Sequence, residues 1–322
     1  MSAAITISRR GGFSPALRQY GGIVVALLLL CAIFAVLSPR FLAFSNFVNI
    51  AQQVSVTAVA AFGMSWVILL GEIDLSVGSI IAVAGMVGAQ SLSHGLGFVP
   101  ALLLAVLSGA AMGALNGILT AKAALPSFIV TVATMGAYRG LVSLPTDGLP
   151  AAIDNDTWLY IGAENFLGLP VLVWVMLALF VVNFVAQSRT VFGRRAYLTG
   201  GNPEAAVYSG IRVDRLRVMA FVLSGLMAGI SGVLLSSRLS SAQTNAGTGY
   251  ELDAIAATVL GGTSLSGGSG TMLGTLFGAL VIGVINNGMN LLSVPYFYQL
   301  IVKGAVIVIA VWIDVRSKQA RT

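Results

Sequence analysis

The sequence predicts an all-α membrane protein with about ten transmembrane helices, and its composition, apolar runs and charge distribution support this. Of 322 residues, 57% are hydrophobic and 9% are charged, and the mean hydropathy is +0.94. About a quarter of the residues in soluble proteins are charged, so this composition places the chain in a bilayer. Ten apolar runs approach or reach the length of a spanning helix: 21–38, 48–70, 75–92, 98–120, 126–144, 169–187, 218–237, 251–266, 271–291 and 295–313.

Basic residues set the expected orientation of these runs. They lie before the first run and after the last, at Arg9, Arg10, Arg18, Arg316, Lys318 and Arg321. Cytoplasmic segments are enriched in Lys and Arg, and an even number of spans returns the chain to the side on which it began. We therefore expect a cytoplasmic segment at 1–20, one membrane domain at 21–315 with a basic cytoplasmic loop at 188–217, and a cytoplasmic tail at 316–322.

The individual runs differ in how well they fit a spanning helix. No small-residue cleavage site follows the first run, 21–38, which favours an uncleaved helix over a signal peptide. The run at 251–266 is the shortest, so a re-entrant helix is the alternative there. The longest loop on the opposite side, 145–167, contains no Lys or Arg, which suits an outside loop. Its carboxylates are Asp147, Asp154, Asp156 and Glu164.

Two parts of the chain share an order of features that suggests an inverted repeat. One part begins with Glu72-Ile73-Asp74 and the other with Glu251-Leu252-Asp253. Each continues with a glycine-rich helix that contains Asn and with a Pro that opens the next span. Spans 2–5 and 7–10 would then run in opposite directions, as in many transporters, with a pathway between the halves. Chance similarity between glycine-rich apolar segments is the alternative.

Residues that carry chemistry are scarce. Cys31 is the only cysteine and His94 the only histidine, which excludes a disulfide within the chain and a histidine metal cluster. No G-x-x-x-x-G-K-[ST] phosphate loop is present, and the glycine-rich run at 261–270 lacks the lysine that such a loop needs. The positive charges flank apolar runs instead of forming a patch with aromatic residues. We expect no catalytic residue, no metal, no cofactor and no nucleic-acid partner for this chain.

A short polar helix is predicted inside the basic loop. Asn202 is a good N-cap, Pro203 suits the first helical position, Glu204 complements the positive end of the helix dipole, and Gly210 can end the helix. Such a helix is suited to docking a cytoplasmic partner. An ordinary amphipathic connector is the alternative.

The spacing E-A-A-x-x-x-G in this helix resembles the loop by which ABC-importer permeases contact their ATPase. From about Phe41 to Asp314, the chain is similar to the permease subunits of bacterial ribose-type monosaccharide ABC importers, which are binding-protein-dependent inner membrane components. The similarity also rests on three other segments, 71–78, 125–140 and 247–268. Glu72 departs from the glycine usual in ribose permeases, which leaves other pentoses, hexoses and polyols open.

The resemblance implies partners and a location. It implies a cytoplasmic ABC ATPase that binds ATP and Mg, a periplasmic sugar-binding protein and a second permease subunit, identical or paralogous. It also implies contact with lipid in the bacterial inner membrane. The residues that would couple to the ATPase are Gly201, Asn202, Pro203, Glu204, Ala205, Ala206 and Gly210.

Polar and aromatic residues near the membrane give further candidates. Those for a pathway or gate are Glu72, Asp74, Asn116, Asn287, Phe297 and Tyr298, with helix capping, helix packing or interfacial anchoring as alternative roles. Lys303 lies well inside a span and needs a partner, for which we expect Asp253 or Glu251. Arg40, Arg139 and Arg238 fall at outer span ends and are candidates for docking the binding protein, with simple anchoring as the alternative.

Two alternatives to a sugar importer remain. A secondary transporter or channel without an ATPase would fit the composition and the repeat. An ABC permease for a nucleoside or an amino acid would share the spacing and periodicity. Neither periodicity nor spacing separates these substrates.

Overall fold

Helices make up most of the structure, a computed structural model that describes residues 15–319. The elements are α1(Pro15–Leu37), η1(Pro39–Leu42), α2(Phe44–Leu69), α3(Val77–Ser93), α4(Phe98–Ala121), α5(Ser127–Ser143), η2(Leu144–Thr146), β1(Ala151–Ala152), α6(Asp156–Ala163), β2(Asn165–Phe166), β3(Leu169–Pro170), α7(Val171–Arg189), α8(Val191–Gly201), α9(Pro203–Tyr208), α10(Val213–Arg238), β4(Ser241–Ala242), α11(Tyr250–Leu260), α12(Met272–Leu291) and α13(Tyr296–Gln319). The strands form two short antiparallel pairs, β1 with β4 and β2 with β3. The predicted all-α class is confirmed.

Seven helices are long and apolar enough to cross a membrane: α1, α2, α4, α5, α7, α10 and α12. Two shorter apolar segments, in α3 and α13, occupy two more of the predicted runs. Nine of the ten predicted runs therefore correspond to one long apolar helix each, with ends displaced by a few residues. The predicted segment at 1–20 and tail at 316–322 fall partly outside the described residues, as do Arg9, Arg10 and Arg321.

The predicted run at 251–266 is the exception, because its helix α11 ends at Leu260 after 11 residues. At 1.5 Å per residue this helix covers about 16 Å, roughly half of the hydrocarbon core. The rest of the distance to α12 is covered by the glycine-rich loop 261–271, in which Gly262, Gly267, Gly268 and Gly270 have positive φ. We call α11 with this loop the broken span. It crosses the fold as half helix and half loop, which differs from the expected continuous or re-entrant helix.

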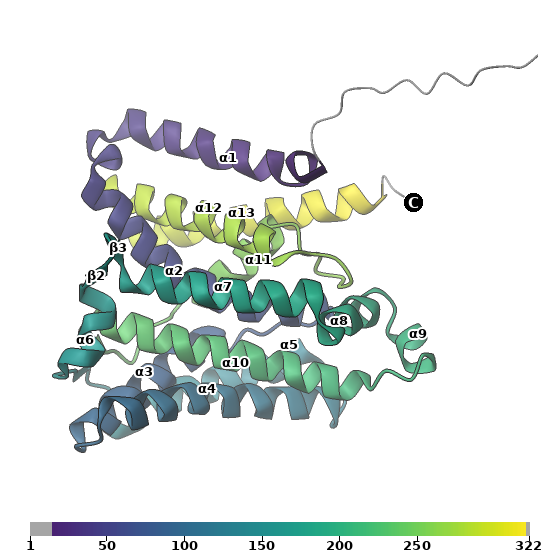
Figure 1. The fold of residues 1–322 in the computed structure, drawn as a ribbon, viewed down its shortest axis with the longest axis horizontal. Coiled ribbons are helices and arrows are strands. Elements are labelled where there is room, and N and C mark those ends of the chain that lie inside the picture. The colour runs from purple at the N-terminus through teal and green to yellow at the C-terminus, as the bar shows by residue number, and fades with distance from the viewer. Residues whose placement is uncertain (1–14, 320–322) are drawn as a thin grey trace, which may run out of the picture.

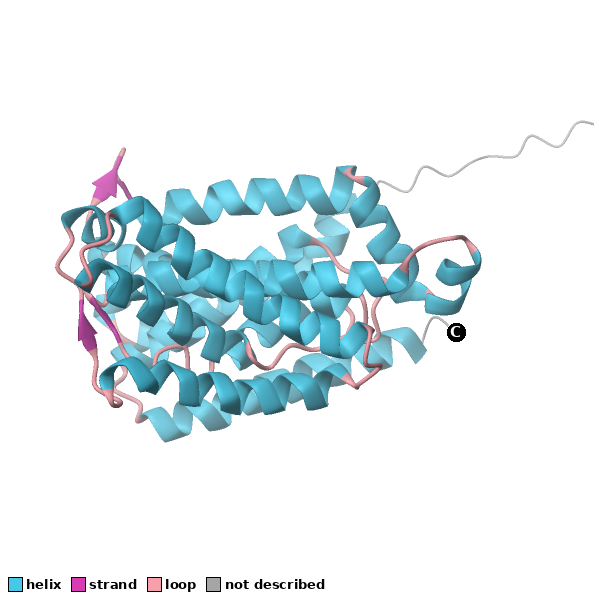
Figure 2. Cartoon of the chain, turned by 90° about the horizontal axis from the view of Figure 1, so that it is seen from below, coloured by secondary structure: helices cyan, strands magenta, loops and turns pink. Residues whose placement is uncertain are grey.

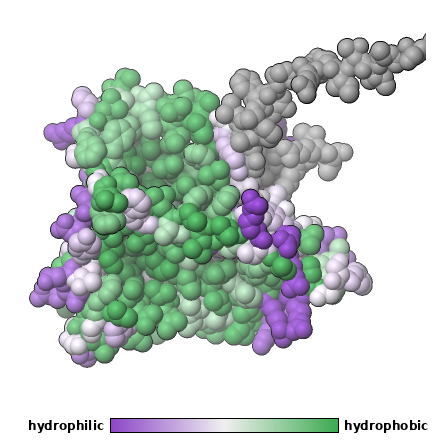
Figure 3. All heavy atoms as spheres, in the orientation of Figure 1, coloured by the Kyte–Doolittle hydropathy of each residue, from purple (hydrophilic) through white to green (hydrophobic). Residues whose placement is uncertain are grey.

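Two opposite ends of the helix bundle define its orientation. In Figure 1, α8 and α9 lie at one end together with the first turn of α1 and the last turn of α13. The strands and α6 lie at the other end, as Figure 2 also shows. We call these the α9 end and the α6 end. The middle of the surface is mainly apolar and the hydrophilic residues gather toward the two ends (Figure 3), as a spanning protein requires.

Helix packing follows the predicted repeat of α2–α5 and α10–α13. α2 and α10 pack against each other at the centre. α10 also packs on α3 and α4, just as α2 packs on α11 and α12, and α5 contacts α3 as α13 contacts α11. α2 ends at the α9 end, where the Leu69 carbonyl accepts from Gly268, whereas α10 ends beside α6. The two halves therefore run in opposite directions.

Glycines allow a close crossing of α4 and α10. Gly109 and Gly113 of α4 face Gly225 of α10 so closely that a methyl group added to any of the three would overlap the backbone of the opposite helix. Small residues that let backbones approach replace the hydrophobic effect as the source of helix association in lipid. This crossing joins one repeat to the other.

Candidate functional site

The predicted polar helix exists as α9, and it stands out from the end of the bundle (Figure 1). The Asn202 side-chain oxygen accepts from the Ala205 amide at 2.9 Å, and Pro203 occupies the first turn. Gly210 adopts φ +77° and donates its amide to Val207, which ends the helix. The sequence therefore specified this helix through its cap, its proline and its glycine. A second short helix before it, α8, was not predicted.

The outer face of α9 is exposed. Glu204 lies in the first turn, Val207 is 58% exposed and Tyr208 is 91% exposed, whereas Ala206 faces inward and is buried. An aromatic and an aliphatic side chain held outward on a capped helix at the aqueous end of a membrane protein are suited to contact with another protein. We call α8 and α9 with the turn between them the knob.

Replacing Asn202 with alanine should loosen the knob without unfolding the bundle. Loss of an N-cap costs about 1 kcal/mol, which raises the equilibrium constant for opening of α9 roughly fivefold. Hydrogen exchange of the amides at 205–208 would measure this change. Asn202→Asp keeps a capping oxygen and should retain the protection of the wild type, so equal protection in the alanine variant would contradict the proposed cap.

Asp74 forms the centre of a buried polar network near the α9 end. One carboxylate oxygen accepts from the amide of Ser76 at 3.0 Å and from its hydroxyl at 2.6 Å, and the other accepts from the hydroxyl of Ser224 on α10 at 2.8 Å. Asn116 on α4 donates to the Ser76 hydroxyl at 2.8 Å, and the Tyr138 hydroxyl donates to Asn116 at 3.3 Å. Asp74 and Asn116 are fully buried, so here they join four helices and do not face solvent.

Asp253 forms the matching network in the second repeat. Lys303 on α13 places its Nζ 3.0 Å from both carboxylate oxygens, and Asn286 on α12 donates to one of them at 3.1 Å. Of the two carboxylates expected to pair with Lys303, the structure places Asp253 in contact. The Glu251 side chain instead accepts from the Gly249 amide at 3.2 Å. Asp74 and Asp253 therefore have similar roles in the two repeats, since each accepts a hydrogen bond from a neighbouring helix.

The other pathway candidates lie apart from these networks. Glu72 forms an ion pair with Arg217 on α10 at 2.9 Å, and Asn287 donates to Asn46 on α2 at 2.9 Å while buried. Phe297 and Tyr298 are 60% and 54% exposed, with ring centroids 4.6 Å apart. In this structure Asp74, Asn116 and Asn287 bond across helices. A pathway or gate role stays a prediction for all six candidates: Glu72, Asp74, Asn116, Asn287, Phe297 and Tyr298.

The three arginine candidates have different surroundings. Arg139 donates to the backbone carbonyls of Thr244 at 3.2 Å and Ala246 at 2.6 Å, which ties α5 to the loop after β4. Arg40 is exposed and Arg238 is half-buried at the end of α10. Docking of a partner stays a prediction for all three, and Arg139 has a structural role in addition.

Sequence reasoning identified the carboxylates but missed most of their partners. Ser76, Ser224 and Arg217 complete the networks of Asp74 and Glu72. A serine or arginine on α10 carries no sequence signal for contact with a residue about 150 positions earlier. The repeat would have pointed to an asparagine in each network, because Asn116, which donates to Ser76, and Asn286, which donates to Asp253, occupy corresponding glycine-rich helices.

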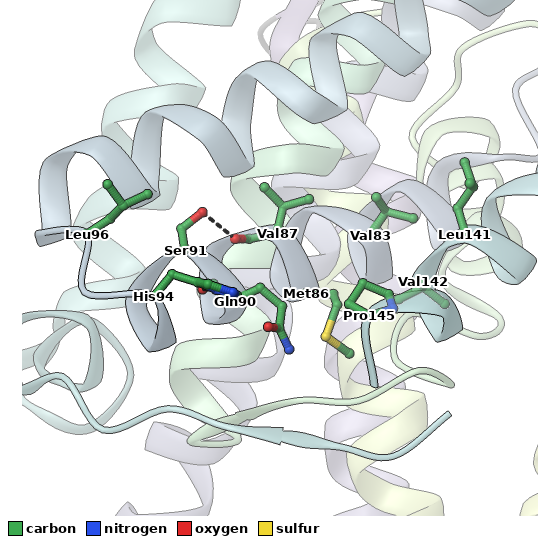
Figure 4. A pocket seen from close by; sticks show the side chains of 10 residues that line it. All are labelled: Val83, Met86, Val87, Gln90, Ser91, His94, Leu96, Leu141, Val142 and Pro145. Atoms are coloured by element: carbon green, nitrogen blue, oxygen red, sulfur yellow. Dashed lines mark hydrogen bonds between the residues drawn. The ribbon is translucent and has the colours of Figure 1, made fainter. Parts of the chain in front are cut away.

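A cavity of about 630 Å³ lies between α3 and α5 toward the α6 end (Figure 4). Most of its wall is apolar, with Val83, Met86 and Val87 on α3. The polar side chains in the wall are Gln90, Ser91 and His94. Of these, the Ser91 hydroxyl already donates to the Val87 carbonyl at 2.7 Å.

Comparisons with known proteins place these features in a family. A family model described as "Branched-chain amino acid transport system / permease component" matches residues 46–311. A ribose import permease protein, RbsC, of Bacillus subtilis is 46% identical over 317 residues, covering 98% of each chain. RbsC of Escherichia coli K12 is 44% identical over 313 residues, 96% of this chain and 98% of the relative. An L-arabinose ABC transporter permease protein, AraH, of Azospirillum brasilense is 37% identical over 319 residues, which cover 99% of this chain and 94% of the relative.

Proposed function

Because this chain belongs to the family of ABC-transporter permease components that contains the ribose import permeases, we propose that it is the membrane-spanning subunit of a monosaccharide importer. ATP hydrolysis on a separate ATPase drives transport in this proposal, and ATP and Mg bind to that subunit. The chain itself performs no chemical reaction. Its task is to present a path for the sugar alternately to the two sides of the membrane.

The observation that carries the proposal is the knob. It places Glu204, Val207 and Tyr208 outward at one aqueous end of an apolar bundle, where a soluble subunit can bind. The base of the knob contacts the ends of α2 and α10, the two central helices of the repeats. A displacement of the knob would thus reach both halves of the bundle. A transporter without an ATPase would have no use for such a protrusion.

Similarity to relatives supports a sugar as the substrate. The family description names branched-chain amino acids, whereas individual relatives at 37–46% identity are named for ribose and L-arabinose, and one at 39% for D-allose. Whole-length similarity to the sugar permeases outweighs the broader description. Glu72, which forms an ion pair with Arg217 where ribose permeases usually have glycine, leaves the choice among pentoses, hexoses and polyols open.

The proposal also assigns the two ends of the bundle. The α9 end, with the described ends of α1 and α13, faces the cytoplasm and its ATPase, and the α6 end faces a periplasmic sugar-binding protein in the bacterial inner membrane. Arg40 and Arg238 are then available to the binding protein. The cavity between α3 and α5 opens part of a path near that side. A second permease subunit, identical or paralogous, completes the path.

Uptake of labelled sugars by cells of the source organism tests this function. Cells that lack the chain should lose ATP-dependent uptake of one of D-ribose, L-arabinose and D-allose, and the wild-type chain should restore it. Restored uptake of leucine alone would overturn the sugar assignment. Transport by the purified chain alone in liposomes would overturn the ABC mechanism.

Changing Val207 and Tyr208 together to serine should remove the apolar contact of the knob. We expect at least a tenfold loss of uptake and loss of the ATPase that copurifies with the tagged chain, since aromatic residues dominate binding energy at protein contacts. Leu149 and Leu167 are similarly exposed at the α6 end, at 67% and 76%. Changing both to serine should leave copurification of the ATPase unchanged. Equal copurification in the two double variants would contradict the assignment of the knob.

A further inference from the structure

The last turn of α8 fits tightly between two other segments at the α9 end. Gly200 lies against the carbonyl of Leu69, the last residue of α2, and against the amide of Gly268 in the loop 261–271. These two groups bond to each other, the Gly268 amide donating to the Leu69 carbonyl at 2.9 Å. A methyl group added to Gly200 would overlap both. We call this three-way contact the glycine joint.

Side chains strengthen the connection between the knob and the loop. The Tyr197 hydroxyl on α8 donates to the Gly270 carbonyl at 2.6 Å. One turn before α8, the Gln187 side chain accepts from the Met272 amide, the first residue of α12, at 2.6 Å. Tyr197 thus bonds α8 to the loop, and Gln187 bonds the end of α7 to the first residue of α12 just after it.

The two ends of the broken span are held differently. At the α6 end, the buried ion pair of Asp253 and Lys303 fixes α11 to α13, and Asn286 fixes it to α12. At the α9 end, the loop has glycine at 262, 267, 268 and 270, all with positive φ, and a residue without Cβ can change φ and ψ more widely than any other. Displacement at the glycine joint would therefore bend the loop while α11 keeps its place. The loop is the part of the broken span that can act as a hinge.

Polar groups near the joint lack partners in this arrangement. Among the described residues, the hydroxyls of Thr199, next to Gly200, and of Thr263, beside Gly270, are buried without a hydrogen bond. Buried hydroxyls without partners are unfavourable, so an arrangement of the joint that satisfies them would be favoured.

We propose that the glycine joint transmits movement of the knob to the loop 261–271, so that this loop is the moving part of the path at the α9 end. Tyr197 and Gly200 are positioning residues in this scheme, since they act on the loop and not on the sugar. The inference rests on the proposed function and specifies the segment to which movement of the knob is transmitted. It also explains why this span is interrupted, because a continuous helix would resist local bending.

Tyr197→Phe tests the joint without adding bulk, and Tyr20→Phe is its matched control. The Tyr20 hydroxyl lies 3.0 Å from Thr271 Oγ1, one residue from the Tyr197 contact, but it belongs to α1 and not to the knob. The permease is purified with its ATPase and binding protein and placed in liposomes, where sugar uptake and ATP hydrolysis are measured together. Tyr197→Phe should lower the sugar carried per ATP several-fold, because the knob loses its side-chain bond to the loop. Tyr20→Phe should not change it.

Gly200→Ala provides the second test, with Gly136→Ala on α5 as the control. Nothing in the described part of the chain lies within 4 Å of a methyl group placed at Gly136, and Gly136 is exposed. Gly200→Ala should keep the ATPase bound and hydrolysing ATP but lose transport, whereas Gly136→Ala should transport normally. If Gly200→Ala does not accumulate, the tyrosine pair decides the question.

The outcomes separate this inference from the proposed function. Wild-type liposomes that show no ATP-dependent sugar uptake would contradict the proposed function itself. Normal wild-type transport with an unchanged ratio of sugar to ATP in Tyr197→Phe would overturn the glycine joint alone. A drop in Tyr197→Phe with unchanged ATPase copurification and normal transport in Tyr20→Phe would support the joint, because a merely structural role of bonds to this end of the loop would lower transport in both variants.

Discussion

Replacing Gly113 with leucine is expected to prevent the chain from accumulating in a folded state. A side chain at this position would enter the backbone of α10 at Phe221 and Gly225, where no flexible atom can move aside. Overpacking a close contact costs about 1 to 3 kcal/mol even where neighbours can adjust, and here the two repeats would have to separate. We expect a loss at the upper end of that range or beyond.

The matched control is Gly136→Leu on α5. Nothing in the chain lies within 4 Å of a methyl group placed at Gly136, although Gly136 and Gly140 have the same four-residue spacing as Gly109 and Gly113. Both variants would be compared by the amount of chain in the membrane fraction and by thermal unfolding in nanodiscs. Equal accumulation of Gly113→Leu and Gly136→Leu would show that the crossing of α4 and α10 is not as close as the structure places it.

Replacing Lys303 with methionine is expected to destabilise the protein strongly. The side chains of Lys303 and Asp253 are 11% and 4% exposed, so the change leaves a carboxylate buried with Asn286 as its remaining side-chain donor. Removing one partner of a buried ion pair costs about 3 to 5 kcal/mol, because the other charge stays away from water. Such a loss is a large share of the roughly 5 to 15 kcal/mol that stabilises a typical folded protein.

The double variant Asp253→Asn with Lys303→Met separates charge from packing. It removes both buried charges, and an asparagine can still bond to Asn286, so much of the lost stability should return. Tryptophan fluorescence during heating in nanodiscs would rank the wild type, the single variant and the double variant. A Lys303→Met variant as stable as the wild type would contradict a structural role for the pair, and a double variant no better than the single one would contradict the explanation by charge.

The sequence predicted much of this fold because lipid leaves few alternatives. A long apolar run in a bilayer must satisfy its backbone hydrogen bonds internally and so becomes a helix, which fixed nine of the ten runs. The α9 helix was predictable for a local reason, since Asn202, Pro203 and Gly210 determine its start and end within a few residues. The partner of Lys303 was predictable because a buried cation needs a carboxylate and only Glu251 and Asp253 stood at a suitable depth.

The prediction of a continuous helix at 251–266 failed for a physical reason. Glycine, serine and threonine make up nearly all of the loop after α11, and because these small residues are also common in packed transmembrane helices, the sequence did not show where the helix ends. The loop is stable because its backbone groups find partners elsewhere, such as the Leu69 carbonyl and the Tyr197 hydroxyl. Those partners come from helices about 200 and 70 positions earlier in the chain.

By itself, then, the sequence determined which segments enter the membrane, which short helix projects from it and which family the chain resembles, since these depend on hydropathy, local capping and motif order. The tertiary structure alone decided which buried polar groups meet: Asp74 with Ser224, Gly200 with Gly268, and Asp253 in preference to Glu251 as the partner of Lys303. Contacts of this kind depend on distance in space, and the crossing of α2 and α10 at the centre of the inverted repeat sets those distances.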